Sequence, residues 1–429
     1  MKIKSLEIEK YKMYGLVMLI AWIICGQMHA QLSNGWRGPD RNGIYQETGL
    51  LKKWPEEGVP LLWSVNNAGK GYSSPVVVGN KIFVTGMDIE EKNEILTAYT
   101  IDGKQLYQVK YGKPWSQSYP ETRTTPMVVE DRVYVISGIG EIVCMQVNDG
   151  SICWSVNGNE KFGAKTNTWG ISESPLVFDN KVIFTPGGDQ TTMVALDALT
   201  GETIWTTPSL NDLCSHVSPL LIVHNGRKLI IGFSEDYLYA VHPETGEMLW
   251  QYNDWDFVAE RGMDGICINT PLYKDGRLFI SNAYEMRSHM LELNEDGSAV
   301  RTLWRNDDLS VHTGGMVLVD HIIYGSNWFN NNSGNWVAVD WNTGATTYKA
   351  SWPGGGSKGS VITADKMLYC YEERRGTVAL VKPNAGGLDI VSQFRIREGE
   401  GPHWSHPVID HGVLYIRHGS ALMAYKIKE

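Results

Sequence analysis

The segment Ala195-Leu-Asp-Ala-Leu-Thr-Gly-Glu-Thr-Ile-Trp205 returns as Ala240-Val-His-Pro-Glu-Thr-Gly-Glu-Met-Leu-Trp250. In both copies an apolar strand ends in a tight turn, where glycine takes the positive φ that the reversal needs, and the next strand carries a tryptophan. Weaker copies cover 98–107, 143–154, 291–304, 338–348 and 379–394. This self-similarity predicts a repeat architecture, with the flat aromatic wedged against the neighbouring repeat.

A second mark opens each repeat, and in six of eight cases it is Ser, Thr or His followed by proline. Proline is tolerated there because the strand's hydrogen-bond ladder has not yet begun. The eight openings are Ser74-Pro75, Thr125-Pro126, Ser174-Pro175, Ser218-Pro219, Thr270-Pro271, Gly315-Met316, Ser360-Val361 and His406-Pro407. A hairpin turn and an alternating strand follow, so one unit is four strands, averaging roughly 47 residues, as in propeller blades.

The two ends of the chain complement each other. The last unit stops at its third strand, 421–427, while Pro60-Leu-Leu-Trp-Ser-Val65 looks like a fourth strand without a blade. Pairing them would close the ring and leave no free edge. We therefore predict an all-β fold, an eight-bladed β-propeller of four-stranded antiparallel blades, with residues 31–429 as its single domain. Seven blades is the alternative, because the copies after Trp250 are the most eroded.

The first 30 residues read as a secretory signal. Lysines at 2, 4, 10 and 12 precede an apolar run over 14–25, and Ala30 offers a small residue for cleavage. Lipoprotein processing at Cys25 is less favoured because bulky Ile24 precedes it. We expect an exported protein, periplasmic or secreted, with no transmembrane segment in the mature chain. Cys144 and Cys153 flank a turn and could lie close together, although burial as small apolar residues is the simpler expectation.

Composition narrows the range of partners. The chain has 45 Gly and 16 Trp and a formal net charge of −10. An acidic surface repels phosphate backbones, so nucleic acid is an unfavourable partner. We expect a monomer that binds a partner protein or a saccharide-like ligand.

The Ala-x-Asp-x-x-Thr-Gly-x-x-x-Trp signature resembles the pyrroloquinoline-quinone (PQQ) type of propeller repeat, and copies extend from about Trp36 to the end. The resemblance implies one of two activities. Some such proteins are quinoprotein dehydrogenases that hold PQQ and Ca²⁺ in the central funnel, while others resemble the partner-binding propeller of the outer-membrane β-barrel assembly machine. This chain has no Cys-Cys dipeptide and no recognisable calcium set, so we predict no cofactor. PQQ with Ca²⁺ is the alternative.

Candidate binding residues lie in the loops that precede the openings, because those loops surround the mouth of a propeller's funnel. These loops are rich in polar and aromatic groups. The predicted ligand-binding residues are Arg123, Lys165, Trp169, Glu173, His216, Asp264, Asn269, His312, Lys358, Trp404 and His406. Cations there would bind anionic groups, histidines with carboxylates would serve as acid and base, and tryptophans would stack on sugar faces. The alternative is that these side chains only solvate and cross-link loops around a water-filled channel.

The sequence contains no complete catalytic constellation and no metal-ligand spacing, and the catalytic residues are unknown. The leading hypothesis is therefore an exported, non-catalytic propeller that binds a partner protein or a carbohydrate-like ligand. The rival is a quinoprotein-type oxidoreductase, or another sugar-acting enzyme, that uses the central funnel.

Overall fold

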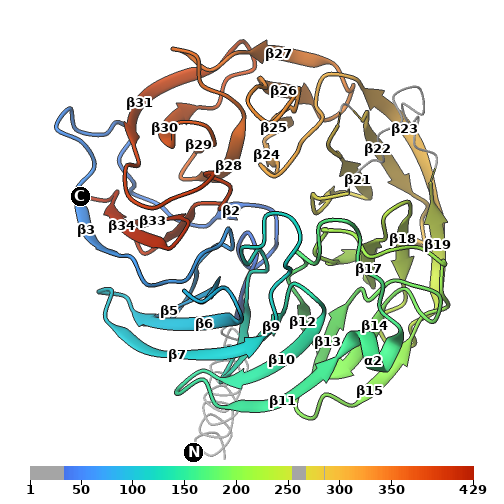
Figure 1. Cartoon of the computed structure of the whole chain (residues 1–429). Helices are drawn as coiled ribbons and strands as arrows, with labels where there is room; N and C mark the ends of the chain where they lie inside the picture. The colour runs from blue at the N-terminus through green and yellow to red at the C-terminus, as the bar shows by residue number, and fades with distance from the viewer. Residues whose placement is uncertain (1–32, 254–266, 285) are drawn as a thin grey trace, which may run out of the picture.

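The computed structural model describes residues 33–253, 267–284 and 286–429. Its strands form eight antiparallel sheets arranged radially about a central axis (Figure 1). The eight-bladed prediction is confirmed. The predicted signal peptide and Cys25 lie outside the described residues.

Within each of blades 1 to 7, the strand that comes first in the sequence lies nearest the axis, and the following strands lie successively further out. Blade 1 consists of β4(Val76–Val78), β5(Lys81–Met87), β6(Glu94–Thr100) and β7(Gln105–Gly112), and blade 2 of β8(Met127–Val129), β9(Arg132–Ile136), β10(Glu141–Gln146) and β11(Ile152–Asn157). Blade 3 consists of β12(Leu176–Phe178), β13(Lys181–Phe184), β14(Val194–Asp197) and β15(Thr203–Thr206), and blade 4 of β16(Leu220–His224), β17(Arg227–Phe233), β18(Leu238–Val241) and β19(Met248–Tyr252). One short helix, α2(Gly158–Phe162), follows β11.

Blades 5 to 8 repeat the plan, and the last of them takes its outer strand from the N-terminal part of the chain. Blade 5 consists of β20(Leu272–Lys274), β21(Arg277–Ile280), β22(Ser288–Leu293) and β23(Val300–Asn306), and blade 6 of β24(Val317–Val319), β25(Ile322–Ser326), β26(Trp336–Asp340) and β27(Thr346–Ala350). Blade 7 consists of β28(Gly359–Ala364), β29(Met367–Glu372), β30(Thr377–Lys382) and β31(Asp389–Arg395), and blade 8 of β32(Val408–Asp410), β33(Val413–His418), β34(Ala421–Lys426) and β3(Leu61–Val65).

The ring closes where β3 joins β34. The two strands pair antiparallel, with Ser64 opposite Met423 and Val65 opposite Leu422. The predicted pairing of the two chain ends is confirmed, and blade 8 has its fourth strand. The hydrophobic cores lie between neighbouring blades; one continuous cluster joins β29, β33, β34 and β5, across the closure itself.

An aromatic side chain on the outer strand of one blade packs under the turn glycine of the next blade. Trp154 on β11 donates from Nε1 to the carbonyl of Ala198 at 3.0 Å, and Trp205 on β15 makes the same bond to Pro243. A Cβ on Gly201 would lie 2.8 Å from the Trp154 ring. The repeated tryptophan and the repeated glycine are thus the two halves of one contact between blades.

The axis of the ring is occupied by the N-terminal part of the chain. β1(Ser33–Asn34) pairs with β8, and β2(Ile44–Tyr45) runs parallel to β28. Between them, buried Arg37 donates to the carbonyls of Val361 and Met316, and buried Arg41 donates to the carbonyl of Ser174. This segment, residues 33–45, is called the axial plug below. It joins inner strands on opposite sides of the ring and fills the space that an open channel would need.

The described cysteines are all free, and Cys144 is buried while Cys153 is exposed. Burial raises the pKa of the Cys144 thiol to about 12, which makes it inert. Across the described ranges, no helix is long and apolar enough to span a bilayer.

Ring closure predicts a specific cross-link. Replacing Ser64→Cys together with Met423→Cys places two thiols on directly opposed residues of an antiparallel pair, a separation that a disulfide can span. We expect the linked peptide in mass spectra of the oxidised protein. The control pairs Ser64→Cys with Ile416→Cys, one strand further away on β33. Equal linkage in both variants, or none in the first, would contradict the closure.

Candidate functional site

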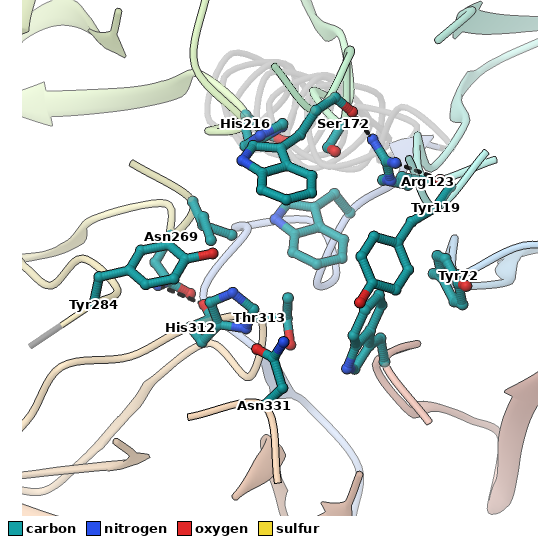
Figure 2. Close-up of a pocket in the computed structure, with 15 residues that line it drawn as sticks. Tyr72, Tyr119, Arg123, Ser172, His216, Asn269, Tyr284, His312, Thr313 and Asn331 are labelled. Carbon is teal, nitrogen blue, oxygen red and sulfur yellow. Dashed lines mark hydrogen bonds between the residues drawn. The ribbon is translucent and has the colours of Figure 1, made fainter. Parts of the chain in front are cut away.

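A pocket of about 200 Å³ lies at the centre of one face of the ring (Figure 2). Two classes of loop build it, the loops that precede the openings of every blade except blade 7 and the loops between the second and third strands of blades 5 and 6. Its floor includes Trp36 of the axial plug. Because the plug fills the axis below, the pocket ends blindly inside the ring.

One side of the pocket is an aromatic arc. The ring centroids of Tyr72 and Trp404 are 4.9 Å apart, those of Trp404 and Tyr119 are 5.1 Å apart, and those of Tyr119 and Trp169 are 6.2 Å apart. Edge-to-face and tilted contacts of this length stabilise the rings in fixed positions. The arc is therefore a preformed apolar surface, and its member Tyr119 is 43% exposed at the mouth.

Arg123 holds the arc together. Its guanidinium donates to the carbonyl of Trp169, and to the carbonyls of Ser118, at 2.7 Å, and Tyr119. Figure 2 draws bonds of Arg123 to neighbouring lining residues as dashed lines, on the side of the pocket where Tyr119 lies. Burial lowers the pKa of Arg123, an effect opposed by Tyr72 and nearby carboxyl groups. Arg123 thus fixes two loops through backbone acceptors and has few N–H groups left for a ligand.

His216 lines the pocket and carries an unpaired donor. Asn167 accepts from the Trp169 backbone N–H through Oδ1 at 2.9 Å, so its Nδ2 is the atom that faces His216 Nε2 at 3.2 Å. An amide nitrogen only donates, so Nε2 accepts and the proton of the neutral ring sits on Nδ1. No described residue bonds to that buried Nδ1. An unmet buried donor costs about 1–3 kcal/mol.

Asn269 and His312 continue the polar side. The Asn269 Nδ2 donates to the carbonyls of Val311 at 2.8 Å and His312 at 2.9 Å, which leaves Oδ1 as the side-chain acceptor of this lining residue. His312 Nδ1 is buried and has no hydrogen-bond partner among the described residues. Figure 2 places His216, Asn269, Tyr284 and His312 together, across the pocket from Tyr119 and Tyr72.

Both pocket histidines are neutral. Burial lowers the pKa of His216 to about 3, helped by the charge of Arg123, and burial lowers that of His312 to about 3, helped by Lys358. Neutral imidazoles with such pKa values neither donate nor take up protons efficiently near pH 7. The polar side therefore offers hydrogen bonds without charge.

Six of the predicted site residues line this pocket: Arg123, Trp169, His216, Asn269, His312 and Trp404. Their place here supports the interpretation of the loops before the openings as the funnel mouth. Asp264 lies outside the described residues.

The other four predicted residues are committed elsewhere. Lys165 pairs with Asp189 at 3.0 Å on the surface, and Lys358 pairs with buried Glu373. Both oxygens of buried Glu173 accept from the backbone N–H of Thr185 at 3.1 Å. His406 accepts from Arg37 Nη1 at 2.7 Å and donates to the carbonyl of Thr313 at 2.6 Å. These contacts engage all four side chains with other parts of the protein, and none of the four lines the pocket.

Sequence reasoning missed Trp36, Tyr72 and Tyr284 as lining residues. Tyr72 precedes the first opening, as the predicted site residues precede theirs. Its position in the repeat therefore indicates that it lines the pocket. Tyr284 and Asn331 come from loops between second and third strands, which reach the same face. Trp36 arrives with the axial plug, and no repeat position indicates it.

Residues 91–350 match the family described as outer membrane protein assembly factor BamB. The chain belongs to this family. BamB of Alkalilimnicola ehrlichii is 27% identical over 184 residues, 42% of this chain and 43% of that protein. BamB of Escherichia coli is 22% identical over 216 residues, 49% of this chain and 47% of that protein. The chain spans about half the length of the curated relatives it matches.

Solved structures share the BamB-type fold. BamB from Moraxella catarrhalis superposes with a TM-score of 0.59 at 14% identity, covering 86% of this chain and 98% of that one. Quinohemoprotein alcohol dehydrogenase from Comamonas testosteroni superposes with a TM-score of 0.64 at 12% identity, covering 91% of this chain and 79% of that one. At these identities the likeness concerns the fold alone.

The quinoprotein neighbours raise the question of PQQ and Ca²⁺. Calcium requires several oxygen ligands, usually including carboxylates. Among the described residues, no Asp or Glu lines the pocket, and no group of three His, Cys, Asp or Glu residues is arranged to hold a metal. Arg123, the cation at the pocket, already bonds to three carbonyls. The described residues therefore do not fit the PQQ–calcium pair.

The bonding of Arg123 predicts a structural penalty for its loss. Arg123→Ala leaves three backbone carbonyls without their charged donor, and we expect the free energy of unfolding to fall by about 2–4 kcal/mol. Lys165→Ala is the matched control, because its exposed ion pair contributes about 1 kcal/mol or less. Urea denaturation followed by tryptophan fluorescence measures both. Equal stability of the two variants would show that Arg123 does not hold the loops.

The neutral histidines predict a titration result. Because burial lowers the pKa of His216 and His312 to about 3, their ¹⁵N imidazole resonances should not shift between pH 8 and pH 5. His411, whose pKa Asp410 raises, should titrate and serves as the control. The unfolded chain takes up these protons at about pH 6.5, so each buried histidine lowers the free energy of unfolding as pH falls from about 6.5 toward 3. Titration of His216 near pH 6.5 would contradict its burial.

Proposed function

We propose that this protein is an exported, non-catalytic binding scaffold of the BamB type, whose recognition site is the central pocket. The observation that carries the proposal is the division of the pocket into an aromatic arc and an uncharged polar side. Trp, Tyr and Arg at the centre of a concave surface are the residues that dominate recognition sites. Here they are held in place before any ligand arrives.

The described lining residues supply no pair of groups for chemistry. General acid–base catalysis needs a side chain whose pKa lies near the working pH, and His216 and His312 titrate near 3. Buried Glu94 and Glu173, whose pKa values burial raises to about 8, lie outside the lining. A pocket of this kind holds a molecule without converting it.

Membership in the BamB family supports a partner polypeptide as one occupant, since the name of that family describes an assembly factor. The aromatic arc supports a carbohydrate-like occupant. Either occupant would contact the aromatic arc, so the first question is whether the pocket is the recognition site. Export places that partner or ligand in the periplasm or outside the cell.

Photo-crosslinking tests the site without knowledge of the ligand. A benzophenone amino acid replaces exposed Tyr119 at the pocket mouth, and the protein is irradiated inside its host before its intact mass is measured. We expect one or a few discrete mass increments, whether the occupant is a polypeptide or a small molecule. The increments should disappear when Trp169→Ala is added.

The matched control carries the same group at Leu199, which is 56% exposed in a turn on the opposite face of the ring. Position 199 should give no discrete increment. The same adducts from both positions, or adducts at 119 that survive Trp169→Ala, would place recognition outside the pocket and contradict the proposal.

A further inference from the structure

We propose that the central pocket binds a neutral pyranose, either a free sugar or the terminal residue of a glycan. This inference rests on the proposed function, and it names the chemical class of the occupant. It depends on the shape of the pocket, on the arrangement of its two sides, and on the protonation of His216.

The pocket accommodates one ring. Its volume of about 200 Å³ lies below the range of about 300–1,000 Å³ that drug-sized ligands occupy. The axial plug closes its inner end at Trp36. A blind pocket of this size receives a terminal group and does not pass an extended chain, which argues against a polypeptide segment lying through it.

The two sides match the two surfaces of a pyranose. The Tyr72–Trp404–Tyr119–Trp169 arc offers flat apolar surface, and a sugar ring presents its C–H groups on a flat face. Hydroxyl groups project from the ring edge, and each one both donates and accepts hydrogen bonds. The residues of the opposite side carry one group of each kind, the His216 Nδ1–H donor and the Asn269 Oδ1 acceptor.

The unpaired donor is the strongest sign of a missing ligand oxygen. His216 is 8% exposed and lines the pocket, and its buried Nδ1 has no partner among the described residues. Buried N–H groups in folded proteins are nearly always paired. A sugar hydroxyl is an acceptor that meets this donor without bringing a charge.

The lining favours ligands without charge. No carboxylate lines the pocket among the described residues, and the guanidinium of Arg123 already serves three carbonyls. An anion entering the pocket would lose its hydration, and it could not form the usual paired contact with this guanidinium because both terminal nitrogens already donate to carbonyls. The pocket therefore selects neutral ligands.

Titration of the full-length protein with sugars tests the inference. The panel holds glucose, galactose, mannose, N-acetylglucosamine and neutral oligosaccharides that end in each, with glucuronate and short acetylated peptides for comparison. We expect quenching of tryptophan fluorescence, confirmed by calorimetry, by at least one neutral pyranose. Binding of monosaccharides points to a free sugar, and binding of oligosaccharides alone points to a glycan terminus. Both support the proposal.

Variants of His216 separate a binding role from a structural one. His216→Phe removes the Nδ1–H and should weaken binding about tenfold. It also removes the Nε2 acceptor of Asn167, a loss that removal of the unmet Nδ1 donor offsets, so the thermal midpoint should stay close to that of the wild type. His216→Asn keeps an amide near the Nδ1 position and should restore part of the affinity. His321→Phe, at an exposed position outside the pocket, is the control and should bind as wild type.

Three results would overturn the pyranose assignment: no response to any neutral sugar, a response to glucuronate or peptides alone, or unchanged affinity in His216→Phe. If crosslinks form at position 119 while the sugars fail, the scaffold function stands and the ligand class is wrong. If position 119 gives no crosslink and no sugar binds, both proposals fail.

Discussion

The contact between an outer-strand aromatic ring and the turn glycine of the next blade holds this ring together. A four-stranded sheet cannot bury its own apolar faces, so each blade depends on its neighbours. At five junctions a Cβ on the turn glycine would come within 2.5–2.8 Å of the neighbouring ring, among them Gly103 against Trp63 and Gly344 against Trp304. Glycine thus serves two needs at one position, since its φ of 74° at Gly201 also makes the reversal. The same contact explains why the chain repeats both residues.

Closure extends this contact around the whole circle. Trp63 belongs to β3, which enters blade 8 from the N-terminal side of the chain, and its Nε1 donates to the carbonyl of Ile101 in blade 1 at 2.8 Å. One strand therefore completes the last blade and holds the first. The axial plug adds a second tie, because Arg37 and Arg41 bond to carbonyls on opposite sides of the ring. Buried guanidiniums are stable there because backbone oxygens satisfy them.

The fold could be predicted from the sequence because its determinants recur. Turn glycine, outer-strand aromatic and opening proline each come back in blade after blade, and even the missing eighth outer strand was identified by its tryptophan. The axial plug could not be predicted. Arg37 bonds to Val361 and Met316, far away in the chain, through carbonyl oxygens that every residue carries. A contact made to backbone atoms leaves no pattern in the residue types of its partner.

The sequence indicated which loops surround the pocket, but it did not indicate which of their side chains line it. The loops before the openings contribute Trp169 and His216 to the pocket lining. The same reasoning also selects Lys358, which instead forms a buried ion pair with Glu373. Whether a polar side chain faces a pocket or supports its wall depends on neighbours from other blades, which repeat spacing does not specify. The proton on His216 Nδ1 follows in turn from Asn167, one blade away. Chemistry in a propeller is thus a property of loops meeting across blades, so one scaffold serves quinone enzymes in its structural neighbours and presents a ring-sized pocket with an uncharged polar side here.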